Sequence, residues 1–69
     1  MTQKERIVQY LDDFGSITTM EAFSDLGITL LASRIHELVR NGLPIKKEMV
    51  TSKNRYGEEV HFTRYSKAV

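Results

Sequence analysis

The sequence predicts an α+β domain in which three helices are followed by a β-hairpin. Apolar residues recur at helical spacing as far as Pro44, and they alternate with polar residues beyond it. Glycines stand at the ends of the predicted segments, where chain reversals are needed. With 69 residues, the chain is expected to form one domain spanning residues 1–69.

The first helix is predicted between Thr2 and Gly15. Thr2 and Glu5 have the spacing of a capping box, in which each side chain bonds the backbone N–H of the other residue. Gly15 can adopt the left-handed conformation that ends a helix. The predicted apolar stripe of this helix consists of Ile7, Tyr10, Leu11 and Phe14.

The second helix is short and follows almost at once. Thr18 and Glu21 form another capping box, and Ile17 can pack on Ala22 as a hydrophobic staple. Gly27 is placed to end the helix. Its predicted apolar stripe consists of Ala22, Phe23 and Leu26.

The third helix is predicted to begin at Thr29 as its N-cap. Asn41 and Gly42, followed by Pro44, supply a C-terminal stop. The joint between the second and third helices is therefore tight. The apolar side of the third helix is expected to carry Leu31, Ile35, Leu38 and Val39.

Two alternating segments after Pro44 predict a hairpin closed by a type I turn over residues 54–57. Pairing Asn54 with Gly57 places Met49 opposite Phe62, and Thr51 opposite Val60. The apolar residues of both strands then share one face. That face is expected to cover the helices.

Composition excludes several classes of protein. The chain has no cysteine and only two histidines, so it offers no thiolate metal site and no catalytic triad; we expect no cofactor and no enzyme activity. No uncharged stretch approaches the roughly 20 residues of a membrane span. The first residues show no signal-peptide pattern, so a cytoplasmic location is expected.

Charge is divided unevenly along the chain, although the net charge is only +1. Residues 1–28 hold two cations against five anions, a balance of −3. Residues 29–69 hold eight cations against four anions, a balance of +4. Such asymmetry indicates a polyanionic partner for the second part of the chain.

Four segments carry a resemblance to a known family: residues 26–29, 34–38, 41–45 and 53–58. Together with the order of the elements, they resemble the small winged helix-turn-helix domains of phages and prophages of Gram-positive bacteria. The resemblance covers nearly the whole chain. It implies that the third helix enters the DNA major groove and that the hairpin, or wing, lies along the backbone or minor groove. It also implies a transcriptional regulator or an excision accessory factor.

Six residues at or on the third helix are candidate DNA contacts. Arg34 could bond guanine O6 and N7, Ser33 a base edge or phosphate, and Thr29 a phosphate. The alternatives are that Arg34 pairs with a carboxylate of the second helix, that Thr29 is only an N-cap and that Glu37 lies on a solvated face. The full set is Thr29, Leu30, Ser33, Arg34, Glu37 and Arg40.

The wing offers a second basic site. Its candidate DNA contacts are Lys53, Asn54 and Arg55 at the tip, with Lys46 and Lys47 nearer the base. Lys46 and Lys47 could equally protect an exposed strand edge against pairing with another chain.

Double-stranded DNA is therefore the expected partner, bound by a monomer, a homodimer or a cooperative oligomer. A protein-interaction module that inhibits or recruits a host protein is the alternative. Leu30 favours that alternative, because the family commonly has a basic residue at its position.

Overall fold

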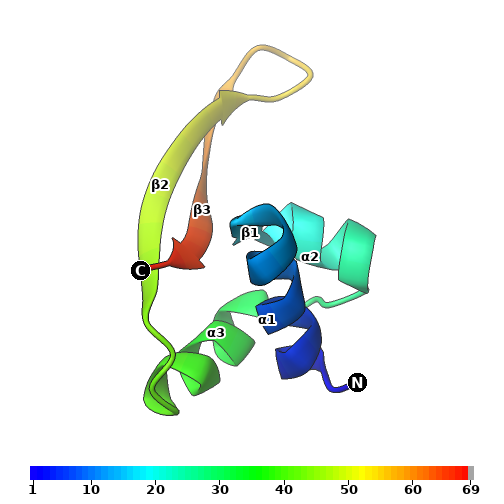
Figure 1. The fold of residues 1–69 in the computed structure, drawn as a ribbon. Helices are drawn as coiled ribbons and strands as arrows, with labels where there is room; N and C mark the ends of the chain where they lie inside the picture. The colour runs from blue at the N-terminus through cyan, green and yellow to red at the C-terminus, as the bar shows by residue number, and fades with distance from the viewer. Residues whose placement is uncertain (69) are drawn as a thin grey trace.

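The protein, seen in a computed structural model that describes residues 1–68, contains three helices and a three-stranded antiparallel sheet (Figure 1). The predicted order of three helices and a hairpin is confirmed. One short strand, β1, was not predicted. The elements are α1 (Gln3–Phe14), β1 (Ser16–Thr18), α2 (Thr19–Leu26), α3 (Leu31–Arg40), β2 (Ile45–Lys53) and β3 (Glu59–Lys67).

Both predicted capping boxes are present. The Thr2 hydroxyl accepts from the backbone N–H of Glu5 at 3.1 Å, and the Thr18 hydroxyl accepts from that of Glu21 at 3.2 Å. In return each glutamate accepts from the backbone N–H of its threonine, at 2.8 and 2.9 Å respectively. Two of the orphan donors at each helix start are thereby satisfied.

The predicted N-cap of α3 is wrong. Leu30, not Thr29, is the N-cap, and no side chain caps the helix. Gly27 adopts φ 69°, and its backbone N–H donates to the Phe23 carbonyl at 3.0 Å, as in an αL cap, while the backbone N–H of the buried Ile28 donates to the Ala22 carbonyl at 2.9 Å. This arrangement leaves Thr29 within the turn, one residue too early to cap the helix.

The core lies where the three helices meet the base of the sheet. Its largest fully buried side chains are Ile7, Leu11, Ile17, Ile28 and Leu31. Ile17 of β1 pairs with Tyr65 of β3, so this short strand joins the sheet to the helical core.

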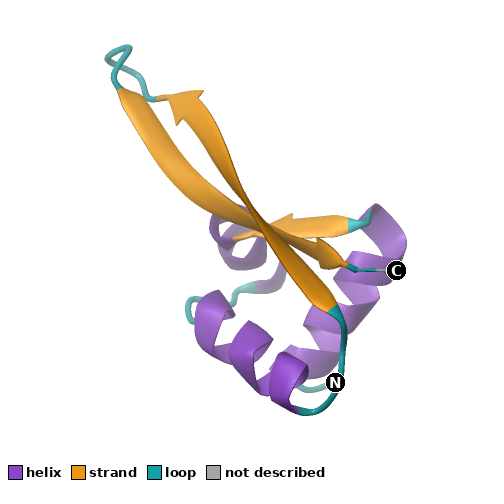
Figure 2. Ribbon diagram, turned by 90° about the vertical axis from the view of Figure 1, so that its left-hand side faces the viewer, coloured by secondary structure: helices purple, strands orange, loops and turns teal. Residues whose placement is uncertain are grey.

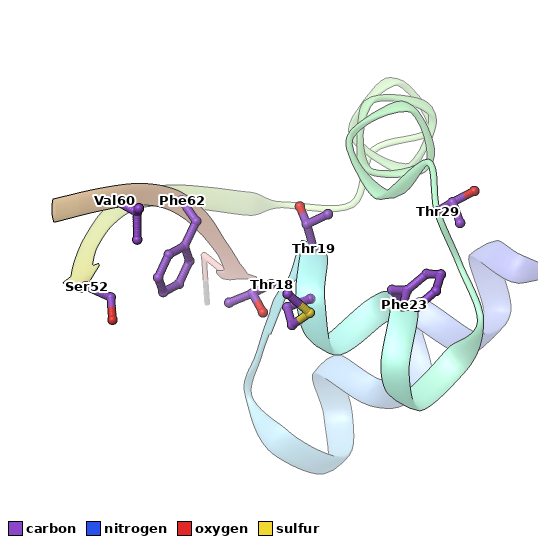
Figure 3. A pocket seen from close by; sticks show the side chains of 8 residues that line it. Thr18, Thr19, Phe23, Thr29, Ser52, Val60 and Phe62 are labelled. Carbon is purple, nitrogen blue, oxygen red and sulfur yellow. The ribbon is translucent and has the colours of Figure 1, made fainter. Parts of the chain in front are cut away.

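Three residues of the predicted apolar stripes lie outside this core. Phe14, Phe23 and Val39 are 69%, 59% and 47% exposed. Phe14 is the last residue of α1, and its ring contacts only the edge of the core through Tyr10, at a centroid distance of 4.6 Å. Phe23 lies on the outer side of α2, where its ring extends toward the segment of Thr29 and lines a surface hollow (Figure 3).

The predicted hairpin register is wrong by one residue. Val50 pairs with Phe62 and Ser52 with Val60, whereas Met49 pairs with Thr63. The predicted turn does form, since Gly57 N–H donates to the Asn54 carbonyl at 3.0 Å. Gly57 then adopts φ 77°, the left-handed conformation of a three-residue hairpin loop, so Asn54 pairs with Glu58 instead.

The distal part of the hairpin projects away from the helices (Figures 1 and 2). The expectation that its apolar face covers the helices is therefore wrong. Met49 is 68% exposed, and only residues near the base, such as Ile45 and Tyr65, pack on the core. Within residues 1–68 no helix is both long and apolar enough to cross a membrane.

Candidate nucleic-acid interface

Helix α3 presents one free face to solvent. Leu31, Ile35 and Leu38 anchor the opposite side in the core. At about 100° per residue, Ser33, His36 and Arg40 then lie on the outer side. The exposed residues of the segment are Thr29, Leu30, Ala32, Ser33, His36, Val39 and Arg40.

Arg34 and Glu37 lie on a different side of α3, facing the start of α1. The Arg34 guanidinium donates to Oε1 of Gln3 and to Oε1 of Glu37, both at 3.0 Å. Glu37 is also 3.6 Å from the Lys4 ammonium. The partner of Arg34 is thus a carboxylate of its own helix rather than one of α2, and a guanine contact would compete with these two hydrogen bonds.

The wing tip exposes Lys53, the last residue of β2, and Arg55, which lies in the loop that Asn54 organises. The Asn54 side-chain oxygen accepts from the backbone N–H groups of Tyr56 and Glu58, at 2.9 and 3.0 Å. Asn54 therefore shapes the loop that presents the two cations. Its contact with DNA stays a prediction.

Lys46 and Lys47 lie near the base of the wing on β2, which is an edge strand because the sheet order is β1-β3-β2. Both side chains are exposed. Their placement suits edge protection and phosphate contact equally. The two interpretations of the sequence therefore stay open.

The cations divide into two groups by their partners. Four are within 4 Å of a carboxylate: Lys4 and Arg34 with Glu37, Arg64 with Glu48, and Lys67 with Asp12. In the described chain the other six have no carboxylate partner. These six are Arg6, Arg40, Lys46, Lys47, Lys53 and Arg55, and all except Arg6 lie on α3 or the wing.

An apolar hollow of about 710 Å³ separates the wing from α2 (Figure 3). Val60 and Phe62 line it from β3 (Figure 3), and Met20 and Phe23 line it from α2. The remaining lining residues are Thr18, Thr19, Thr29 and Ser52. Sequence reasoning missed this hollow because it assigned Phe23 to the core and expected the hairpin face that carries Val60 and Phe62 to cover the helices.

Tyr10 links α1 to α2 behind this surface. Its hydroxyl donates to Oδ2 of Asp25 at 2.6 Å. This hydrogen bond, with burial adding to it, raises the pKa of Tyr10 to about 12. In α1 the hydrogen bonds from Thr2 lower the pKa of Glu5. The Tyr10 hydrogen bond holds α1 to α2, and the Glu5 carboxylate caps the start of α1.

The described residues hold no group of three or more His, Asp or Glu side chains suited to a metal ion.

The comparisons with known proteins identify the family. A sequence model described as a winged helix-turn-helix domain matches residues 2–68. No curated protein and no solved structure matched the chain. The match spans all six elements of the fold, and the chain therefore belongs to the winged helix-turn-helix domain family.

Proposed function

We propose that the protein binds double-stranded DNA through α3 and the wing. In helix-turn-helix domains the second helix of the motif, here α3, is the one that enters the major groove. The observation that carries the proposal is the distribution of unpaired cations. Apart from Arg6, every cation without a carboxylate partner in residues 1–68 lies on α3 or the wing.

The proposed roles follow from these placements. Lys53 and Arg55 contact phosphates from the wing tip, and Arg40 contacts the backbone from the outer side of α3. The guanidinium of Arg34 is already bonded to Gln3 and Glu37, so we assign it a contact with the phosphate backbone rather than a guanine contact. The other proposed contacts are Thr29, Leu30, Ser33, Glu37, Lys46, Lys47 and Asn54.

A titration against mixed-sequence duplex DNA at two salt concentrations tests this function. Binding that weakens steeply as salt increases is expected, because each neutralised phosphate releases condensed counterions. Absence of duplex binding at low salt would reject the proposal. The same titration with duplexes of increasing length reports whether the protein binds as a monomer, a homodimer or a cooperative oligomer.

The narrower role of a phage-type transcriptional regulator or excision accessory factor rests on the resemblance of residues 26–58. A protein with that role would act on DNA in the bacterial cytoplasm. Mapping of the bound site on phage or prophage DNA, near a promoter or near a recombination site, distinguishes the two roles.

A second candidate function is a protein-interaction module that docks a host protein. The apolar hollow between α2 and the wing favours it, together with Leu30, which is 60% exposed. Leu30→Arg separates the two functions. If DNA is the partner, the added cation strengthens binding to mixed-sequence duplex, where no specific base contact is lost. Affinity for mixed-sequence duplex that falls in a variant melting at the parent temperature would favour the protein partner.

A further inference from the structure

The first turn of α3 exposes uncharged side chains where a DNA-reading helix meets the base edges. In helix-turn-helix domains the N-terminal residues of the recognition helix contact the bases. Here the exposed residues of that region are Leu30, Ala32 and Ser33. Leu30 is 60% exposed, although it is a large apolar residue next to the buried Leu31.

These side chains limit which bases the helix can read. Guanine is read by paired donors on its O6 and N7 atoms, adenine by an amide that both donates and accepts, and cytosine by an acceptor. Leucine and alanine offer none of these groups. In the major groove they can contact the C5-methyl group of thymine, which no other standard base carries. The Ser33 hydroxyl can bond several base edges and does not by itself discriminate.

Arg34, the charged donor nearest to this end of α3, is already bound. Arg34 directs its guanidinium to Gln3 of α1 and to Glu37, with both distances at 3.0 Å. Releasing it would break a link between α1 and α3 and would leave Glu37 with only the Lys4 contact at 3.6 Å. Guanine contact through Arg34 is therefore disfavoured relative to methyl contact through Leu30.

We propose that the N-terminal end of α3 recognises thymine methyl groups in the major groove, with Leu30 as the main specificity-determining residue. The preferred site then contains A·T base pairs whose methyl groups face Leu30 and Ala32. This inference rests on the proposed function, because it requires α3 to enter the major groove. The C5-methyl group of 5-methylcytosine presents the same chemistry, so the experiment must distinguish the two sources.

The experiment begins with selection of bound sites from a randomised duplex pool. The expected result is enrichment of A·T pairs at the centre of the contacted site. The enriched duplex is then made again with uracil in place of each thymine in turn, which removes only the methyl group. Affinity is expected to fall by about fourfold for each contacted methyl, the effect of one buried apolar carbon.

Two further duplexes test the source of the methyl group. In the first, the contacted A·T pair is replaced by a G·C pair, which is expected to weaken binding. In the second, the cytosine of that G·C pair carries a C5-methyl group. Partial recovery of affinity shows that the methyl itself is recognised, whereas no recovery shows that other features of the A·T pair are read and overturns the methyl-contact proposal.

Protein variants assign the effect to Leu30. Leu30→Ala is expected to abolish most of the difference between thymine and uracil duplexes, while Met49→Ala, which removes a 68% exposed apolar side chain from the wing, leaves it unchanged. Both side chains are outside the core, so the variants should melt at the parent temperature, and thermal melting checks this.

The outcomes separate this inference from the proposed function. Equal affinity for thymine and uracil duplexes, an enriched site without thymine, or no enrichment at all would each overturn the methyl-contact proposal. Salt-dependent binding to mixed-sequence duplex would still support DNA binding in all three cases. Absence of any duplex binding would overturn both.

Discussion

Removal of the two cations at the wing tip is expected to reduce both the affinity for duplex DNA and its salt dependence. Lys53 and Arg55 are exposed and have no carboxylate partner in residues 1–68, so their charges are available to phosphates. Each phosphate contact contributes about 0.9 to the slope of log affinity against log salt. Two contacts therefore contribute about 1.8.

That slope sets the size of the measured effect. Between about 50 and about 200 mM salt, the parent is expected to lose about twelvefold more affinity than the variant with both Lys53→Ala and Arg55→Ala. Fluorescence anisotropy with a labelled mixed-sequence duplex measures both slopes. Arg6→Ala is the matched control, because it also removes an unpaired cation but from α1, beside Tyr10 and Asp13.

The control must keep the parent slope, whereas each single wing variant should lower it by about half the effect of the pair. Neither wing substitution touches the core, so unfolding curves should coincide with that of the parent. A double variant that binds with the parent affinity and slope would show that the wing does not contact the DNA backbone.

The remaining predictions concern α3 and the helix caps. Arg34→Ala should weaken binding to a preferred site and to random duplex by the same factor; a loss of about tenfold or more confined to the preferred site would restore the guanine contact. Thr18→Ala should lower the free energy of unfolding by about 1 kcal/mol, whereas Thr29→Ala, which removes no helix cap, should change it by less than about 0.5 kcal/mol. Urea unfolding measures both free energies. Equal effects of the two substitutions would contradict the observed start of α3 at Leu31. Tyr10→Phe should lower the free energy of unfolding at neutral pH by about 1 kcal/mol. The folded-state pKa of Tyr10 is raised from 10 to about 12, so the parent should lose this contribution as the pH rises from 10 through 12. A difference in the free energy of unfolding between parent and Tyr10→Phe that stays constant over that pH range would refute the role of the hydrogen bond.

The caps of α1 and α2 could be predicted from the sequence because they depend on residues three apart. Thr2 with Glu5, and Thr18 with Glu21, need no tertiary partner to form. The start of α3 could not be predicted in this way. Thr29 has a favourable residue type, but the burial of Ile28 after Gly27 determines where the helix begins.

β1 was also beyond prediction from local patterns. Its three residues are too few to show alternation, and it exists because Ile17 meets Tyr65 of a strand almost fifty positions later in the chain.

Charge along the sequence indicated a basic second part of the chain, but it could not show which cations lack a carboxylate partner. The pairing of Arg34 with Glu37 and Gln3 depends on how α1 packs beside α3.

The hairpin register connects these local errors to the surface that the molecule presents. A shift of one residue moves a side chain to the other face of a sheet, because side chains alternate with a period of two. With Gly57 in the left-handed conformation, Phe62 lies opposite Val50 and faces the same side as Val60. Met49 falls on the other side of the wing. The single residue added by the loop therefore places Val50 and Ser52, instead of Met49 and Thr51, on the wing face from which Val60 and Phe62 line the apolar hollow.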